Sequence, residues 1–150
     1  MAASIESSVV INRPVEEVFA FISDPESNLA AIDAHVESVE KTTEGPIGSG
    51  TTFRVRQKTP PFGRPRDTTV TFTAVEPNRR IETEGKLGPI SPTGALTFEE
   101  ADGGTRVMFR GEPNPVGVLK LITPVIVRQG QKIWDKRLAR MKSVLEHRGS

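Results

Sequence analysis

Apolar and polar residues alternate along the middle of the chain, between about residues 50 and 110. The apolar positions that keep this period of two are Phe53, Val55, Val70, Phe72, Ile81, Leu96, Phe98, Val107 and Phe109. Such alternation predicts an antiparallel sheet with one buried and one solvated face. Turn-forming residues at 76–79 and 101–104 predict hairpins. A further strand is expected around Val36 and Val39, whose spacing does not keep the same parity, so its register stays open.

Helical spacing follows a first expected strand at residues 5–11. Pro14 fits the first position of a helix, and apolar residues then recur at the spacing of one helical face. This helix should end near Ser23, because Asp24 stands before a proline and a residue in that position disfavours the helical conformation. Asp24 precedes Pro25 and can cap a second short helix.

The last part of the chain predicts a long helix. Its apolar stripe consists of Trp134, Leu138, Met141 and Leu145, and the charged residues Arg137, Arg140 and Lys142 lie off that stripe. Pro124 is expected to kink or restart the helix. Residues 118–127 are apolar nearly all round, which leaves covering loops, a cavity mouth, a dimer contact or a membrane surface as interpretations. The order of elements indicates an α+β domain whose helix covers the sheet.

The segment from Val9 to Pro25 carries the clearest family pattern: a strand runs into Pro-x-Glu-x-Val-Phe and closes on Asp-Pro. It resembles the START/Bet v 1-like (SRPBCC) superfamily, in the branch of polyketide cyclases/dehydrases and lipid transport proteins. Matching pieces recur at 48–51, 104–107 and 137–142. The resemblance covers nearly the whole chain and implies a single domain, 1–150, with a helix-grip fold. In that fold a seven-stranded antiparallel sheet wraps a long C-terminal helix, two short helices follow the first strand, and an elongated cavity remains inside.

The amino-acid composition of the chain disfavours several classes of function. The chain has 20 Lys+Arg against 19 Asp+Glu, a net charge of +1, which does not favour nucleic-acid binding. Cysteine and tyrosine are absent and there are two histidines, a small inventory for acid–base catalysis. No phosphate-binding glycine loop or zinc spacing occurs, so no metal and no cofactor is expected. Without a signal sequence or a transmembrane segment in the sequence, a cytoplasmic location is expected.

The inward positions of the sheet are the candidate cavity wall, although ordinary core packing is the favoured interpretation for any one of them. Gln57, Thr68 and Thr83 are the polar residues with inward parity. Gly130 either permits close packing on the sheet or leaves volume for a ligand. The candidate ligand-binding residues are Phe53, Val55, Gln57, Val70, Phe72, Ile81, Thr83, Phe98, Phe109, Ile122, Ile126 and Gly130.

Two functions compete. The first is binding or transport of a small hydrophobic ligand, such as a lipid, an isoprenoid or a polyketide-like molecule; the second is a cyclase or dehydratase that uses the same cavity. No catalytic residue of the aromatase/cyclase enzymes can be matched onto this chain. Asp33 and His35, two residues apart, are weak catalytic candidates with a structural role as the alternative. Phe62, Leu87 and Ile90 are candidate apolar gates in loops, and a homodimer through residues 118–127 is a further hypothesis.

Overall fold

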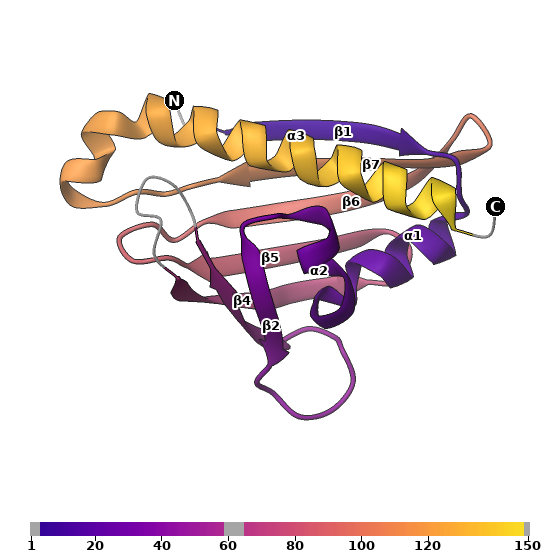
Figure 1. Cartoon of the computed structure of the whole chain (residues 1–150), viewed down its shortest axis with the longest axis horizontal. Coiled ribbons are helices and arrows are strands. Elements are labelled where there is room, and N and C mark those ends of the chain that lie inside the picture. The colour runs from indigo at the N-terminus through magenta and orange to yellow at the C-terminus, as the bar shows by residue number, and fades with distance from the viewer. Residues whose placement is uncertain (1–3, 59–64, 149–150) are drawn as a thin grey trace.

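The sheet and its helices follow the predicted order. The structure, a computed structural model, describes residues 4–58 and 65–148. The elements are β1 (Ile5–Ile11), α1 (Val15–Ile22), α2 (Pro25–Ile32), β2 (Val36–Lys41), β3 (Thr52–Gln57), β4 (Arg66–Glu76), β5 (Arg80–Lys86), β6 (Thr93–Ala101), β7 (Gly104–Glu112), η1 (Gly117–Ile122) and α3 (Thr123–His147). All neighbouring strands are antiparallel, in the order β1-β7-β6-β5-β4-β3-β2. The predicted α+β helix-grip fold is confirmed (Figure 1).

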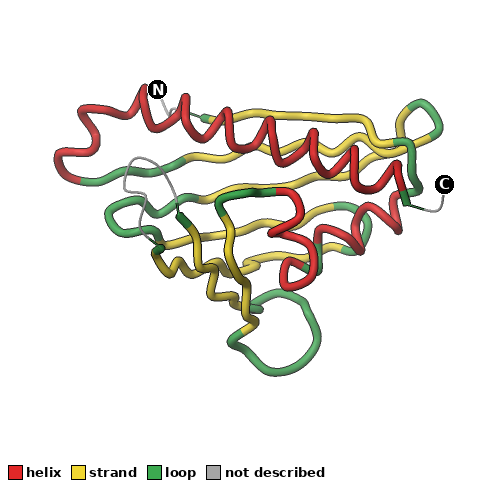
Figure 2. The backbone as a smooth tube through the Cα atoms, in the orientation of Figure 1, coloured by secondary structure: helices red, strands yellow, loops and turns green. Residues whose placement is uncertain are grey.

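Strand parity determines which face of the sheet is buried. In β3, Phe53 and Val55 are buried while Arg54 and Arg56 are exposed. The predicted hairpins join β4 to β5 and β6 to β7 (Figure 2). The β4–β5 turn places Asn78 at φ 63°, in the left-handed region that asparagine tolerates better than most residues.

A β-bulge explains the irregular spacing in β2. Val36 pairs with Gln57, and the register shifts before Ser38 pairs with Arg56. A bulge inserts one extra residue into a strand. Val36 is therefore buried and Val39 packs against the core, although the two residues are three positions apart.

The two short helices use the predicted boundaries with one difference. Pro14 lies just outside α1, in an extended conformation, and the helix begins at Val15. Asp24 caps α2 as expected, because its carboxylate accepts a hydrogen bond from the backbone N–H of Ser27 at 3.4 Å. α2 packs against both β2 and α3.

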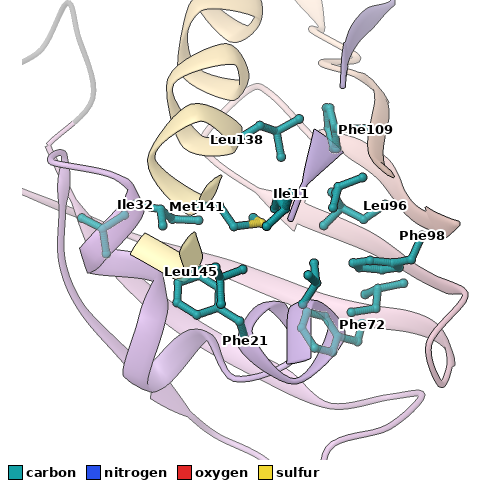
Figure 3. Close-up of a cluster of buried hydrophobic side chains, with 14 of the residues drawn as sticks. Ile11, Phe21, Ile32, Phe72, Leu96, Phe98, Phe109, Leu138, Met141 and Leu145 are labelled. Atoms are coloured by element: carbon teal, nitrogen blue, oxygen red, sulfur yellow. The ribbon is translucent and has the colours of Figure 1, made fainter. Parts of the chain in front are cut away.

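The long helix α3 packs along the sheet with its C-terminal half in the core. Leu138, Met141 and Leu145 are buried and point toward residues of the sheet and of α1 (Figure 3). The predicted helix is interrupted: a 3₁₀ segment, η1, comes first, and α3 restarts with Pro124 in its first turn.

The start of the helical region has a different environment. Val118 and Leu121 are 79% and 84% exposed, so the described loops do not cover them and the covering-loop interpretation is wrong at these positions. Gly130 lies so close to β1 that a Cβ atom there would clash with Cδ1 of Ile5. The glycine therefore permits close packing of α3 on the sheet.

Candidate functional site

A cavity of about 230 Å³ lies between the sheet and the three α-helices. Most of its lining is apolar. The apolar side chains that line it are Phe21, Ile22, Pro25, Leu29 and Ile32 from α1 and α2; Phe53, Val55, Val70, Phe72, Ile81, Leu96 and Phe109 from the sheet; Leu87 and Pro92 from the β5–β6 connection; and Trp134 and Met141 from α3. A concave apolar space with few polar groups is the usual form of a small-molecule site.

Strand parity located most of the sheet contribution. Of the residues that the sequence nominates for ligand binding, the cavity lining includes Phe53, Val55, Gln57, Val70, Phe72, Ile81, Thr83 and Phe109. Their placement shows that the buried face of β3, β4 and β5 serves both as core and as cavity wall. Whether a ligand touches them stays a prediction.

The other nominated residues lie outside the lining. Phe98 packs edge-on against Phe19 of α1, with ring centroids 5.4 Å apart. Ile122 and Ile126 lie in η1 and the first turns of α3, which extend beyond the strands (Figure 1). Gly130 faces Ile5 of β1. Inward parity and helical spacing indicated the face of each residue, but they did not give its position along the cavity.

The polar side chains of the lining differ in whether another group of the protein forms a hydrogen bond with them. Thr68 is buried and its hydroxyl donates to the backbone carbonyl of Val55 at 3.3 Å. Asn28 donates from Nδ2 to the carbonyl of Phe21 at 2.9 Å. Within residues 4–58 and 65–148, the side chains of Gln57 and Thr83 have no hydrogen-bond partner. Both side chains are half-buried and can therefore hydrogen-bond water or a ligand.

One wall of the cavity is an aromatic stack built on two glycines. Gly94 and Gly111 pair directly across β6 and β7. The ring of Phe109 lies over them, and a Cβ atom at Gly94 would lie 2.6 Å from Phe109 Cε1. Trp134 then stacks on Phe109, with ring centroids 3.7 Å apart and an angle of 10° between the planes. The absence of side chains at the two glycines thus leaves space for the Phe109 ring, on which the indole of Trp134 stacks.

An ion pair continues this wall. The guanidinium of Arg137 lies 4.8 Å from the centroid of the Trp134 ring. Asp33 Oδ2 accepts from Arg137 Nε at 2.7 Å and lies 2.6 Å from Nη2. Asp33 Oδ1 accepts from the backbone N–H of His35 at 2.8 Å and lies 3.3 Å from His35 Nδ1. Arg137 is part of the cavity lining, whereas Asp33 and His35 are not.

The surroundings of Asp33 favour its ionised form. Burial raises the pKa of this carboxyl. The guanidinium of Arg137 and the backbone N–H of His35 together lower it by more than burial raises it, so the pKa lies below the ordinary value of 3.8. Asp33 is therefore a carboxylate at neutral pH. It holds the Arg137 side chain in place, which is the structural role that the sequence left open beside the catalytic one.

Sequence analysis missed Trp134 and Arg137 as cavity residues. It assigned Trp134 to the core stripe of the helix and Arg137 to a position off that stripe. The two are three residues apart, a spacing that places side chains side by side on one helix. That spacing indicates that the two side chains are neighbours. It does not indicate that Asp33, the C-cap residue of α2, forms an ion pair with Arg137.

The connection between β5 and β6 contributes to one end of the cavity. Lys86, Leu87, Pro92 and Thr93 are part of the lining there. Leu87 pairs with Ile90, and Ile90 also pairs with Pro115 ahead of η1. The gating roles of Leu87 and Ile90 stay predictions, and Phe62 lies outside the described residues.

The lining limits what chemistry the cavity can perform. Among the described residues it contains no carboxylate and no imidazole, and its ionisable side chains are Lys86 and Arg137. Nor do histidine, aspartate and glutamate side chains gather anywhere in the described chain as a set of three metal ligands. These lining residues therefore offer neither a carboxylate nor an imidazole as a general base.

The family described as polyketide cyclase / dehydrase and lipid transport matches residues 2–146. The chain belongs to this family. Its membership of the START/Bet v 1-like superfamily, expected from the Val9–Pro25 pattern, is confirmed. The polyketide cyclase/dehydrase and lipid transport family supports a ligand-binding or cyclase role for the protein. No curated protein matches the chain in sequence.

Solved structures share the fold at low sequence identity. A START superfamily protein from Mycobacterium smegmatis has a TM-score of 0.80 and 10% identity, covering 95% of this chain and 97% of its own. TTHA0849 from Thermus thermophilus has a TM-score of 0.78 and 16% identity, covering 98% and 99%. The di-domain ARO/CYC StfQ from the steffimycin biosynthetic pathway has a TM-score of 0.78 and 15% identity, covering 99% of this chain and 52% of StfQ.

None of the helices described here is both long enough and apolar enough to cross a membrane.

Proposed function

We propose that the protein binds a small hydrophobic molecule, such as a lipid, an isoprenoid or a polyketide-like ring system, in the cavity between the sheet and α3. The observation that carries the proposal is the lining itself. It is apolar on the sheet and helix sides and, in the described part of the chain, lacks the carboxylates and imidazoles that acid–base catalysis uses. Apolar burial contributes about 25 cal/mol per Å², offset by the cost of ordering the ligand.

The cavity carries its own optical probe. Trp134 is the single tryptophan of the chain, tyrosine is absent, and the indole lies in the lining. Fluorescence excited at the indole band therefore reports on this site alone. Titration with fatty acids, isoprenoid alcohols and polycyclic aromatic compounds should change the intensity or wavelength of Trp134 emission saturably. Native mass spectrometry of protein from its own host then identifies a bound molecule.

Two phenylalanines offer a matched pair of variants. Phe72 and Phe98 are buried to almost the same degree, but Phe72 lines the cavity and Phe98 does not. Phe72→Leu should weaken a verified ligand about fivefold through lost contact area, whereas Phe98→Leu should leave its affinity unchanged. Equal affinity in both variants and the wild type would argue against this cavity as the binding site.

A cyclase or dehydratase is the alternative, favoured by the likeness of the fold to the ARO/CYC protein StfQ. Positioning alone can lower a reaction barrier, so few polar groups do not exclude it. In this alternative Asp33 and His35 are the nominated residues, although neither is part of the cavity lining and Asp33 is paired with Arg137. Turnover of a polyketide-like substrate that survives Asp33→Ala and His35→Ala would remove both from the reaction.

A further inference from the structure

Arg137 is fixed from one side. Both of its contacts to Asp33, from Nε at 2.7 Å and from Nη2 at 2.6 Å, go to the same carboxylate oxygen. Asp33 is held in turn by the backbone N–H of His35. The indole of Trp134 lies against the guanidinium as well. The side chain of Arg137 is only 16% exposed, so the guanidinium has a defined place in the cavity wall.

This arrangement leaves donors unused. A guanidinium carries five N–H groups, two of them on Nη1. Asp33 accounts for Nε and for one group on Nη2, and Nη1 has no hydrogen-bond partner within the described parts of the chain. No buried side-chain nitrogen or oxygen among the described residues lacks a partner, so Nη1 is accessible rather than sealed in the protein. A ligand oxygen in the cavity can therefore take the place of water at this donor.

The charges of the lining determine which oxygen fits best. Its ionisable side chains among the described residues, Arg137 and Lys86, are both cationic. Asp33 contacts Arg137 but is not part of the lining, so the lining presents the guanidinium and not its partner carboxylate. Hydrogen bonds from a guanidinium to a carboxylate are shorter and stronger than those to a neutral acceptor.

We propose that the natural ligand is an amphipathic carboxylic acid, whose apolar body fills the cavity and whose carboxylate accepts hydrogen bonds from Arg137 Nη1. This inference rests on the proposed function and names the chemical class of its ligand. Asp33 acts as the positioning residue, because it orients the guanidinium without lining the cavity.

The test compares probes that share one chain and differ in the head group. Decanoate, methyl decanoate and decanol are titrated into the wild-type protein by calorimetry at pH 7. The wild type should bind decanoate about tenfold more tightly than either neutral probe. The double variant Arg137→Met with Asp33→Asn removes the ion pair without leaving a lone buried charge, and it should bind all three probes about equally. Arg137→Gln is a second variant with the same expectation. Lys86→Met removes the other cation of the lining and should reduce the preference for decanoate less than Arg137→Gln does.

Each outcome separates the inference from the proposed function. If decanol and decanoate bind the wild type equally well, the cavity binds hydrophobic molecules but the carboxylate assignment is wrong. If the preference for decanoate persists without Arg137, or disappears in Lys86→Met instead, the assignment to Arg137 is wrong. If none of the three probes binds, the proposed function fails for ligands of this class and the inference fails with it.

Discussion

The two halves of α3 belong to one helix but have opposite environments. In the C-terminal half, Leu138, Met141 and Leu145 are at most 1% exposed and pack into the core. In the N-terminal half and in η1, apolar side chains face solvent, with Val125 51% and Leu121 84% exposed. The hydrophobic effect therefore stabilises the helix mainly through its second half. The cavity lies where the two halves meet, at Trp134 and Arg137.

The largest loss of stability is expected from a substitution in the buried C-terminal half of α3. Leu138→Ala removes a side chain that is 1% exposed and should lower the free energy of unfolding by about 2–5 kcal/mol, because it leaves a cavity as well as losing apolar burial. Urea denaturation measures the change. A loss below 1 kcal/mol would mean that this half of α3 is not fixed as described.

A smaller and pH-dependent loss is expected for the ion pair beside the cavity. Asp33→Asn should cost about 1–3 kcal/mol at pH 7, because Arg137 then loses its anionic partner. The pKa of Asp33 is lowered in the folded protein, so its stabilising contribution is present above the unfolded value of 3.8 and disappears as the pH falls through the folded value. The difference between wild type and variant should therefore shrink between pH 5 and pH 3. A difference that stays constant over this range would contradict the ion pair.

Gly130, in the N-terminal half of α3, tests the close packing of this helix on β1. Gly130→Ala improves helix propensity by about 1 kcal/mol but crowds Cδ1 of Ile5, so a net destabilisation within about 1 kcal/mol is expected. Ile5→Val removes that carbon atom. In the Ile5→Val background Gly130→Ala should therefore become stabilising, and thermal unfolding of the four proteins of this cycle measures the change of sign. The same effect of Gly130→Ala in both backgrounds would show that Ile5 does not restrict this position.

The smallest effect is expected in the exposed half. Leu121→Ser should change the free energy of unfolding by less than about 0.5 kcal/mol, since the side chain is already in solvent. Denaturation alongside Leu138→Ala gives the contrast directly. A large loss would show that η1 is covered in solution, for instance in the homodimer that remains a hypothesis, and sedimentation would identify such a dimer.

Sequence periodicity predicted the sheet better than the site. Phe72 and Phe98 both have inward parity, and both are buried as expected. Only Phe72 reaches the cavity, because parity gives the face of a strand and not the distance along it. Arg137 could not be found in this way at all. Its inward placement depends on Asp33, a residue distant in sequence, and no local pattern encodes such a pairing.

The position of β1 in the sheet has a consequence for how the chain folds. β1 precedes the other six described strands, and among the described strands its one partner is β7, where Ile5 meets Gly111. α3, which follows β7, also packs on β1. Pairings between distant segments slow folding, because the intervening chain must first be closed into a loop. β1 can therefore pair with β7 only once the chain through Glu112 is present. The strand pairs from β2 to β6 do not need β7 and can form earlier.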